Sequence, residues 1–194
     1  MMHTVTSLGD SGLLLPASVC VFAYLLWRGA HSVALLWAAT LAIGLGTTLV
    51  AKLGFIACGS SIGLAALESP SGHTSFAAIF FGCCALIAGF GRPAWQRLVI
   101  LATAGTVILL VAISRVALRA HTAEEVVGGL AIGCACVGLF AWAHARIDPP
   151  AVRLRPFAVV FAVLVVLLNG HSLSAEPLIR DIAHKLRITM DVCG

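Results

Sequence analysis

Two histidines in this chain stand beside residues that suit acid–base and nucleophilic chemistry. His73 follows Ser71 and Gly72 at the start of a strongly apolar segment, and His121 precedes Glu125 by four residues. Residues four apart on a helix share a face, so the Glu125 carboxylate could hold the His121 imidazole in one tautomer and stabilise its cation. One histidine could then attack a phosphorus atom while the other protonates the leaving group.

The sequence Ser-Pro-Ser-Gly-His at 69–73 has the composition of a helix start that binds an anion. Ser69 could cap the helix, and proline suits its first turn. We expect the N–H groups of Ser71, Gly72 and His73 to point outward with the positive end of the helix dipole, and Gly72 lets an anion approach the backbone. This pattern predicts a phosphate site.

Two basic residues could add charge to this site. We expect Lys52 at the end of one helix and Arg115, which follows Ser114, at the end of another. Arg115 could contact two phosphate oxygens at once.

Each of these residues also has a purely structural interpretation. His73 alone could cap a helix, Glu125 could be an ordinary first-turn acid, and the lysine and arginines could be interfacial anchors. A shared site explains all of them together, because each is expected at a helix end on the same side of the chain. We therefore favour a catalytic site.

The composition places these residues in an integral membrane protein. Hydrophobic residues make up 60% of the 194 residues, charged residues only 10%, and the mean hydropathy is +1.05. A soluble domain carries about a quarter charged residues, so this chain has too few to coat a water-facing exterior. The net charge of +4 is modest and its basic residues are scattered, which argues against nucleic-acid binding.

The hydrophobic pattern predicts one all-α membrane domain over residues 1–194. Six expected transmembrane helices cover 12–27, 33–50, 73–90, 98–113, 126–143 and 157–169. An i, i+4 apolar stripe predicts an amphipathic tail helix at about 176–190 that lies on the membrane surface. Among the cysteines, only Cys58 and Cys193 could meet at a water-facing surface.

The alternation of helices assigns the breaks between them to two sides. The first, third and fifth breaks carry most of the arginines, namely Arg28, Arg92, Arg97, Arg146, Arg153 and Arg155. The positive-inside rule therefore predicts that this side is cytoplasmic. The candidate site belongs to the other side, so we expect it on the periplasmic or extracytoplasmic face of the cell (inner) membrane.

Two motifs resemble the signatures of the type 2 phosphatidic acid phosphatase (PAP2) superfamily. Pro-Ser-Gly-His at 70–73 is similar to the second signature, and Ser114-Arg115 followed by His121 and Glu125 is similar to the third, S-R-x5-H-x3-D. Glu125 stands where the family has aspartate. The first signature, K-x6-R-P, matches only at Lys52, because Gly59 and Ser60 stand where Arg-Pro is expected. The Arg-Pro pairs at 92–93 and 155–156 are expected on the opposite side.

This resemblance implies a six-helix bundle and a metal-independent phosphatase without a cofactor. It implies that His121 is the nucleophile, that Glu125 orients it, and that His73 is the general acid. Lys52, Arg115 and the backbone of Ser71 and Gly72 would bind the phosphoryl oxygens, and Arg119 could replace the missing arginine.

Several substrates and one other class of function stay open at this point. The expected substrate is a membrane lipid phosphate or diphosphate, with undecaprenyl or another polyprenyl diphosphate first, and phosphatidic acid, phosphatidylglycerophosphate or lipid A 1-phosphate as alternatives. A non-catalytic lipid-phosphate binder or transporter on the same scaffold is the second class. Retention of both histidines favours the enzyme, because binding alone requires only cations and amides.

Overall fold

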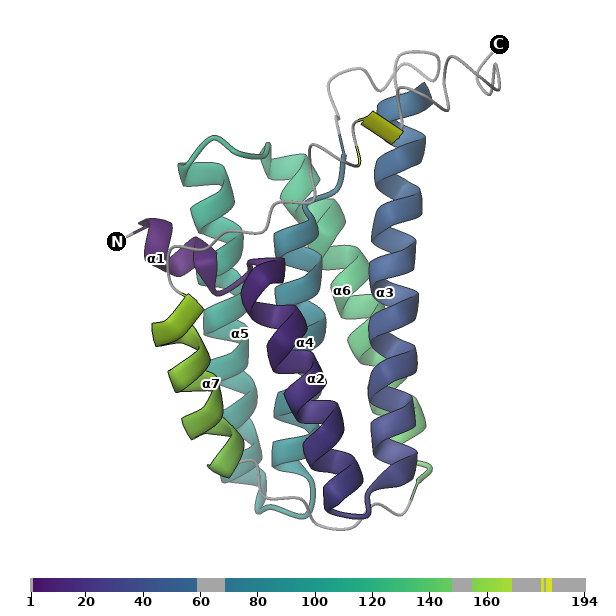
Figure 1. Ribbon diagram of the computed structural model, residues 1–194, viewed down its shortest axis with the longest axis vertical. Helices are drawn as coiled ribbons and strands as arrows, with labels where there is room; N and C mark the ends of the chain where they lie inside the picture. Colours follow the sequence, from purple (N-terminus) through teal and green to yellow (C-terminus); the bar gives the residue numbers. More distant parts are fainter. Residues whose placement is uncertain (1, 59–68, 148–154, 169–178, 180, 183–194) are drawn as a thin grey trace.

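The chain folds into a bundle of helices that run nearly parallel to one long axis (Figure 1). The computed structural model describes residues 2–58, 69–147, 155–168, 179 and 181–182. These ranges contain seven helices and no strand, which agrees with the all-α prediction. The helices are α1 (Met2–Ser7), α2 (Ser11–Trp27), α3 (His31–Cys58), α4 (Gly72–Gly89), α5 (Ala94–Ala117), α6 (Ala123–His144) and α7 (Arg155–Leu168).

Each of the six expected hydrophobic segments coincides with a helix, but several boundaries differ. The second segment continues to Cys58, so Lys52 lies inside α3 and not at its end. The reason is that apolar residues with helix propensity follow Lys52 for another turn and a half. The short α1 was not expected, because its polar sequence MHTVTS shows no apolar period. These differences matter for function, because both Lys52 and helix α1 lie near the candidate site.

Four helices are long and apolar enough to cross a membrane, which indicates a membrane protein. They are α3, α4, α5 and α6, whereas α2 has 17 residues and α7 has 14. The prediction of six spans therefore stays a prediction. Most of the expected tail helix, and the pairing of Cys58 with Cys193, lie outside the residues and side chains that the structure describes.

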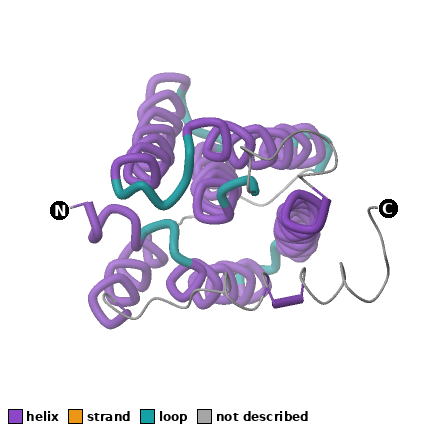
Figure 2. The backbone as a smooth tube through the Cα atoms, turned by 90° about the horizontal axis from the view of Figure 1, so that it is seen from above, coloured by secondary structure: helices purple, strands orange, loops and turns teal. Residues whose placement is uncertain are grey.

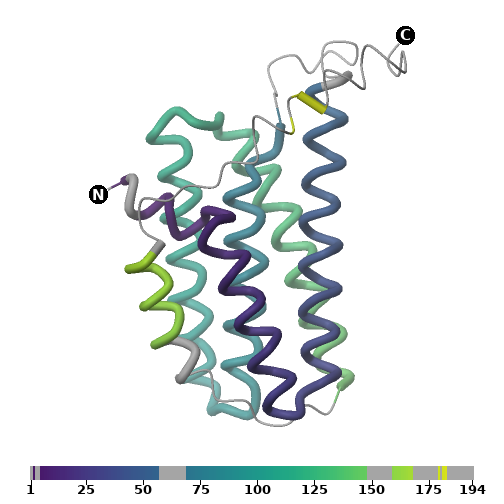
Figure 3. The backbone as a smooth tube through the Cα atoms, in the orientation of Figure 1, coloured from purple at the N-terminus to yellow at the C-terminus, as the bar shows by residue number. Residues whose placement is uncertain are grey.

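The helices alternate in direction, so their connections gather at two ends (Figure 3). The turns α2–α3 and α4–α5, the end of α6 and the start of α7 lie at one end. The end of α3, the start of α4 and the turn between α5 and α6 lie at the other. The sequence analysis expected this grouping, and it brings four segments with the candidate residues to the same end.

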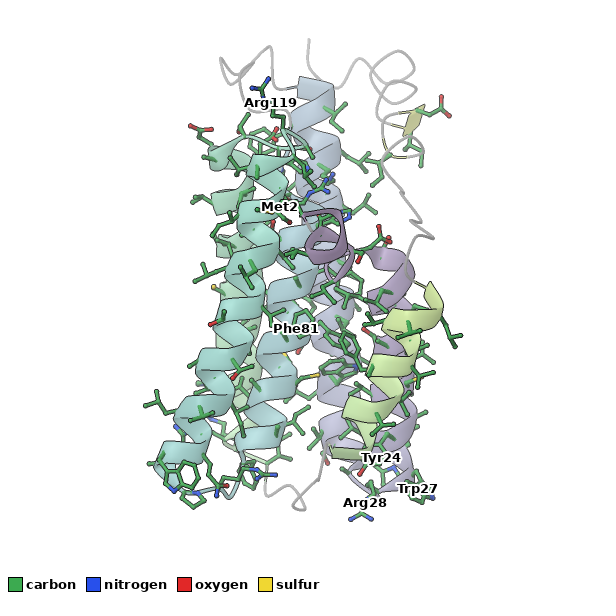
Figure 4. The ribbon with its side chains drawn as sticks, turned by 90° about the vertical axis from the view of Figure 1, so that its left-hand side faces the viewer. Met2, Tyr24, Trp27, Arg28, Phe81 and Arg119 are labelled. Carbon is green, nitrogen blue, oxygen red and sulfur yellow. The ribbon has the colours of Figure 1, made fainter. Side chains whose placement is uncertain are left out.

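The first end carries the basic and aromatic residues expected at a membrane interface. Tyr24, Trp27 and Arg28 lie together there (Figure 4), and the Arg146 guanidinium stacks over the Trp142 ring with Cζ 3.8 Å from its centroid. Such residues are typical of interfaces between membrane and water. The cytoplasmic orientation of this end stays a prediction.

Helix α4 is the central helix of the bundle, because it contacts α2, α3, α5 and α6, and Figure 2 shows the bundle seen along its axis. Of the apolar stretch of α4, 61% is buried inside the protein, against 17% of that of α5. Its Phe80 ring meets Trp37 of α3 edge to face and stacks on Phe161 of α7, with centroids 5.6 and 5.7 Å apart. The rigid core therefore holds the first turn of α4, where the candidate site begins.

Helices α4 and α6 pack closely at positions that lack side chains. A methyl group on Gly133 would lie 2.5 Å from the Ala78 Cβ atom, and one on Gly82 would lie 2.6 Å from a Val137 methyl carbon. Small residues of this kind let membrane helices approach each other. The two helices that carry the candidate histidine motifs are therefore in direct backbone contact.

Candidate active site

Glu125 is the residue around which the candidate site is organised. It is the third residue of α6, and Thr122 is the N-cap of this helix. The Thr122 hydroxyl accepts a hydrogen bond from the Glu125 N–H, and Glu125 Oε2 accepts one from the Thr122 N–H at 3.1 Å. This capping box satisfies two N–H groups at the helix start and fixes the carboxylate in place.

The same carboxylate oxygen contacts the His121 imidazole. His121 Nδ1 lies 2.8 Å from Glu125 Oε2, and both side chains are almost fully buried. The sequence analysis placed both residues on one helix face, which is wrong in detail, because α6 begins at Ala123 and His121 lies in the preceding turn. The capping box brings the carboxylate back to this turn, so the expected contact still forms.

Burial lowers the pKa of the His121 imidazole below its ordinary value of about 6.5. The contact with Glu125 raises this pKa, whereas the positive charges of Arg115 and Lys52 lower it further. His121 is therefore predominantly neutral at neutral pH. A neutral imidazole with Nδ1 held by a carboxylate presents Nε2 as a nucleophile.

Glu125 also holds the loop that precedes α4. The Ser69 N–H donates to Glu125 Oε1 at 3.0 Å, and the Ser71 N–H donates to the Glu125 backbone carbonyl at 2.9 Å. Both contacts join segments more than fifty residues apart in the sequence. The loop with His73 is thus attached to the residue that contacts His121.

This arrangement corrects two expectations about the start of α4. The N-cap is Ser71 and not Ser69, because the Ser69 backbone is bound by Glu125. The Ser71 N–H is also engaged with Glu125, so it does not point outward to a phosphate. The Ser71 side chain makes no capping hydrogen bond and accepts one from the Thr74 hydroxyl. The first-turn N–H groups, beginning at Gly72, are the backbone donors left to bind an anion.

Gly129 allows α6 to lie against the loop before α4. A methyl group at this position would lie 2.5 Å from the Ser71 carbonyl oxygen, a distance that real side chains do not adopt. A methyl group on Gly128 would lie 3.6 Å from the Pro70 Cβ atom, which is an ordinary van der Waals contact. The structure shows that Gly129 sets the position of the Pro-Ser-Gly-His loop.

His73 is paired with an acid that the sequence analysis did not consider. His73 Nε2 lies 3.4 Å from Asp10 Oδ2, and Asp10 is 7% exposed at the N-cap of α2. A sequence signal was available, because Asp10 is one of few acids in the chain and stands in Gly-Asp-Ser-Gly before an apolar run. It was missed because a capping acid is a common feature of helix starts.

The three candidate cations have different positions. Arg115 lies in the last turn of α5, and its Nη1 donates to the Thr6 hydroxyl of α1 at 3.2 Å. Lys52 is 4% exposed, and a methyl group on Gly72 would lie 3.5 Å from its Cε atom. Arg115 and Lys52 both act electrostatically on His121. The structure thus brings Lys52, Arg115, Gly72 and both histidines to one place.

Arg119 is the candidate residue that the structure does not place in the candidate site. Its side chain is exposed, and Figure 4 shows it on the turn between α5 and α6, at the upper end of the bundle. Its backbone is left-handed, with φ 52°. Its role as a phosphate ligand stays a prediction.

Buried hydroxyl groups lie beneath the first turn of α4. The Thr48 and Ser75 hydroxyl groups are 3.0 Å apart, and Ser75 donates to the Gly72 carbonyl at 3.1 Å. Ser71, Thr74 and Ser75 are fully buried. These bonds fix the backbone around Gly72, so its position does not depend on a bound anion.

The remaining polar residues separate clearly from this end. Arg92 donates to the Ala88 carbonyl at the opposite end, as expected for an Arg-Pro pair unrelated to the site. His144, in the last turn of α6, is 5% exposed and stacks on Phe140. In the described part of the chain, no three His, Cys, Asp or Glu residues group together in a way that could hold a metal ion.

Comparisons with known proteins identify the family of this arrangement. The family model of the PAP2 superfamily matches residues 56–149, a range that contains His73, Arg115, His121 and Glu125. An uncharacterized 22.5 kDa protein in the cps region of Klebsiella pneumoniae is 30% identical over 176 residues, which cover 89% of this chain and 84% of that protein. No solved structure matches the chain significantly.

Proposed function

Because the chain belongs to the PAP2 superfamily, which supports a phosphatase-type function, we propose that it is a membrane lipid phosphatase. It hydrolyses a lipid phosphate or diphosphate through a phosphohistidine at His121, without a metal ion. The observation that carries this proposal is the 2.8 Å contact between His121 Nδ1 and Glu125 Oε2. A binding protein has no need of an imidazole held in this way.

The first step transfers the phosphoryl group to His121. Nε2 attacks the phosphorus atom, the N–P bond forms, and the bond from phosphorus to the leaving oxygen breaks. Glu125 stabilises the positive charge that develops on the imidazole, and His73 gives its proton to the leaving oxygen. In the second step His73 takes a proton from water, whose oxygen attacks phosphorus and releases phosphate from His121.

Arg115, Lys52 and the Gly72 N–H bind the phosphoryl oxygens in this mechanism. Phosphoryl transfer depends chiefly on positioning and on stabilisation of charge at these oxygens. Burial strengthens the effect of Lys52 in particular, because a cation removed from water interacts more strongly with an anion. The missing arginine of the first signature leaves these groups as the proposed phosphate site.

The proposed substrate is a lipid, with a polyprenyl diphosphate such as undecaprenyl diphosphate first. The exterior of α5 is apolar, and the connection from α5 to α6 has only five residues, so little structure is present there to bind a large soluble head group. Phosphatidic acid, phosphatidylglycerophosphate and lipid A 1-phosphate are the alternatives. The proposed location of the site is the extracytoplasmic face of the cell membrane, opposite the arginine-rich end.

The test is phosphate release by the purified protein in detergent. Polyprenyl diphosphate, phosphatidic acid and phosphatidylglycerophosphate are offered in parallel with chelator present, and His121→Ala is measured beside the wild type. We expect release by the wild type from at least one lipid and none by the variant. Absence of release by the wild type, with lipid-phosphate binding intact in both proteins, would instead establish a non-catalytic binder or transporter.

A further inference from the structure

Asp10 lies outside residues 56–149, which the family model matches, yet its carboxylate reaches the proposed active site. The structure places Oδ2 3.4 Å from His73 Nε2, while Oδ1 accepts a hydrogen bond from the Gly12 N–H at 2.7 Å. The second contact fixes the carboxylate at the start of α2, because it satisfies an N–H group that the helix leaves unpaired. The two oxygens therefore have separate partners, one structural and one in the site.

The backbone before Asp10 packs directly on His73. A methyl group on Gly9 would lie 3.2 Å from the His73 carbonyl oxygen and 3.4 Å from its Cβ atom. The same methyl group would lie 2.7 Å from a Val111 methyl carbon, a distance that real side chains do not adopt, so the lack of a side chain at Gly9 lets this segment pack beside His73. This packing is independent of the side-chain contact and supports the same placement.

The short helix α1 makes a second contact with the site from the same segment. The Thr6 hydroxyl accepts a hydrogen bond from Arg115 Nη1 at 3.2 Å. Residues 6–10 therefore contact both a proposed phosphate ligand and the proposed general acid. They are joined to α2 through the turn in which the Asp10 N–H donates to the Ser7 carbonyl.

We propose that Asp10 is a positioning residue that orients His73 for proton donation to the leaving oxygen. This inference rests on the phosphatase function proposed above. The Asp10 carboxylate favours the protonated imidazole of His73, whereas burial and the positive charge of Arg115 disfavour it, so the contact with Asp10 acts in the direction that proton donation requires.

The proton balance follows from the His73 ring nitrogen that Asp10 contacts, which is Nε2. With Nε2–H directed to Asp10, the Nδ1–H of His73 gives its proton to the leaving oxygen as the phosphorus–oxygen bond breaks. His73 is then neutral, and its remaining proton stays on Nε2, directed toward the Asp10 carboxylate. When water attacks the phosphohistidine, Nδ1 takes a proton from it, and the His73 cation is restored for the next cycle.

The test uses Asp10→Asn, because asparagine keeps the capping oxygen and removes the charge. Its kcat is measured on phosphatidic acid, whose alcohol leaving group requires a proton, and on 4-nitrophenyl phosphate, whose leaving group does not. We expect kcat on phosphatidic acid to fall about 10- to 100-fold, and on 4-nitrophenyl phosphate to change less than about threefold. Glu124→Gln, which removes an exposed carboxylate at the same end, should match the wild type on both.

A double-mutant cycle separates positioning from a general structural role. If Asp10 acts through His73, Asp10→Asn combined with His73→Ala is no slower on phosphatidic acid than His73→Ala alone. Equal loss on both substrates, no loss on either, or additive losses in the cycle would overturn the inference. If Asp10→Asn does not fold, as judged by thermal unfolding, Asp10→Ser is used instead, because serine also caps a helix. Its loss of kcat on phosphatidic acid is compared with its loss on 4-nitrophenyl phosphate in the same way.

Failure of the proposed function is distinguishable from failure of this inference. A wild-type protein that releases no phosphate, or a His121→Ala variant with full activity, would remove the phosphatase mechanism itself. A wild-type enzyme that loses activity in His121→Ala, but shows no leaving-group selectivity in Asp10→Asn, would retain the phosphatase and exclude Asp10 as a positioning residue.

Discussion

Replacing Glu125 by glutamine is the most informative perturbation of the proposed site. The carboxylate accepts hydrogen bonds from two backbone N–H groups, Ser69 on Oε1 and Thr122 on Oε2, and also contacts His121 Nδ1. Glutamine has the same shape but only one acceptor oxygen. In either orientation, therefore, its NH₂ group faces an N–H donor, and the negative charge opposite the imidazole is lost.

The expected loss of activity can be bounded from these contacts. A buried donor left without a partner costs about 1–3 kcal/mol. If this whole cost is added to the activation free energy, the rate falls roughly 5- to 150-fold. Neutralising the acid of a Ser-His-Asp triad lowers kcat by about 10⁴, because the histidine tautomer and its developing charge are no longer held. We therefore expect Glu125→Gln to lower kcat by about 100- to 10,000-fold.

The pH dependence gives an independent check with a definite sign. His121 must be neutral to attack, so wild-type kcat/KM rises with pH through its pKa, which burial holds below about 6.5. Glu125 raises this pKa, and its removal leaves only burial, Arg115 and Lys52, all of which lower it. The acid limb of Glu125→Gln should therefore move to lower pH even though kcat falls.

The assay is steady-state phosphate release from acid to mildly alkaline pH, with thermal unfolding measured for each protein. Glu125→Asp is the charge-preserving control. It keeps the carboxylate but is one methylene too short to serve the capping box and His121 together, so its loss should be smaller than that of Glu125→Gln. A Glu125→Gln enzyme within about threefold of the wild type, or an acid limb that moves to higher pH, would refute this reasoning.

Three further predictions concern packing and phosphate binding. Gly129→Ala should lower kcat more than about tenfold by displacing the loop before α4, whereas Gly128→Ala, where the added methyl meets only ordinary contact, should be nearly neutral in phosphate release. Arg115→Lys should lower kcat/KM about 10- to 100-fold because the planar fork is lost, and Arg92→Lys at the opposite end should not change it. Lys52→Met should raise KM for the lipid phosphate while the protein stays folded, as measured by phosphate release and thermal unfolding; an unchanged KM would remove Lys52 from the phosphate site.

Much of the fold follows from hydrophobic periodicity, because lipid requires long apolar helices and gives them a strong signal. The six expected segments coincide with helices, and helix alternation placed the candidate residues at one end. Crossing of the membrane by α2, which has 17 residues, and by α7, which has 14 within the described part of the chain, stays a prediction. The unexpected α1 lacks an apolar period, and local capping with contact to α5 holds it instead.

The spacing of the motifs indicated which residues gather, but not how each is held. Sequence spacing suggested a shared helix face for His121 and Glu125, whereas the contact is made by a capping box that reaches back into the preceding turn. The same contact gives a physical reason for glutamate, because a longer side chain can reach the N-cap N–H group. The role of Asp10 could not be derived from spacing, since its distance from His73 depends on the packing of α2 against α4.

The close backbone contact between α4 and α6 restricts how the proposed lipid substrate can reach the candidate site. Gly129, Gly133 and Gly82 join the two helices from the proposed site toward the middle of the bundle, with no room for a side chain at these positions. A hydrocarbon chain needs more space than a methyl group, so it cannot pass along this boundary while the helices stay packed. Lateral entry of a substrate, and exit of its dephosphorylated product, must therefore follow another helix boundary, and α4 and α6 act as the fixed wall against which that route opens.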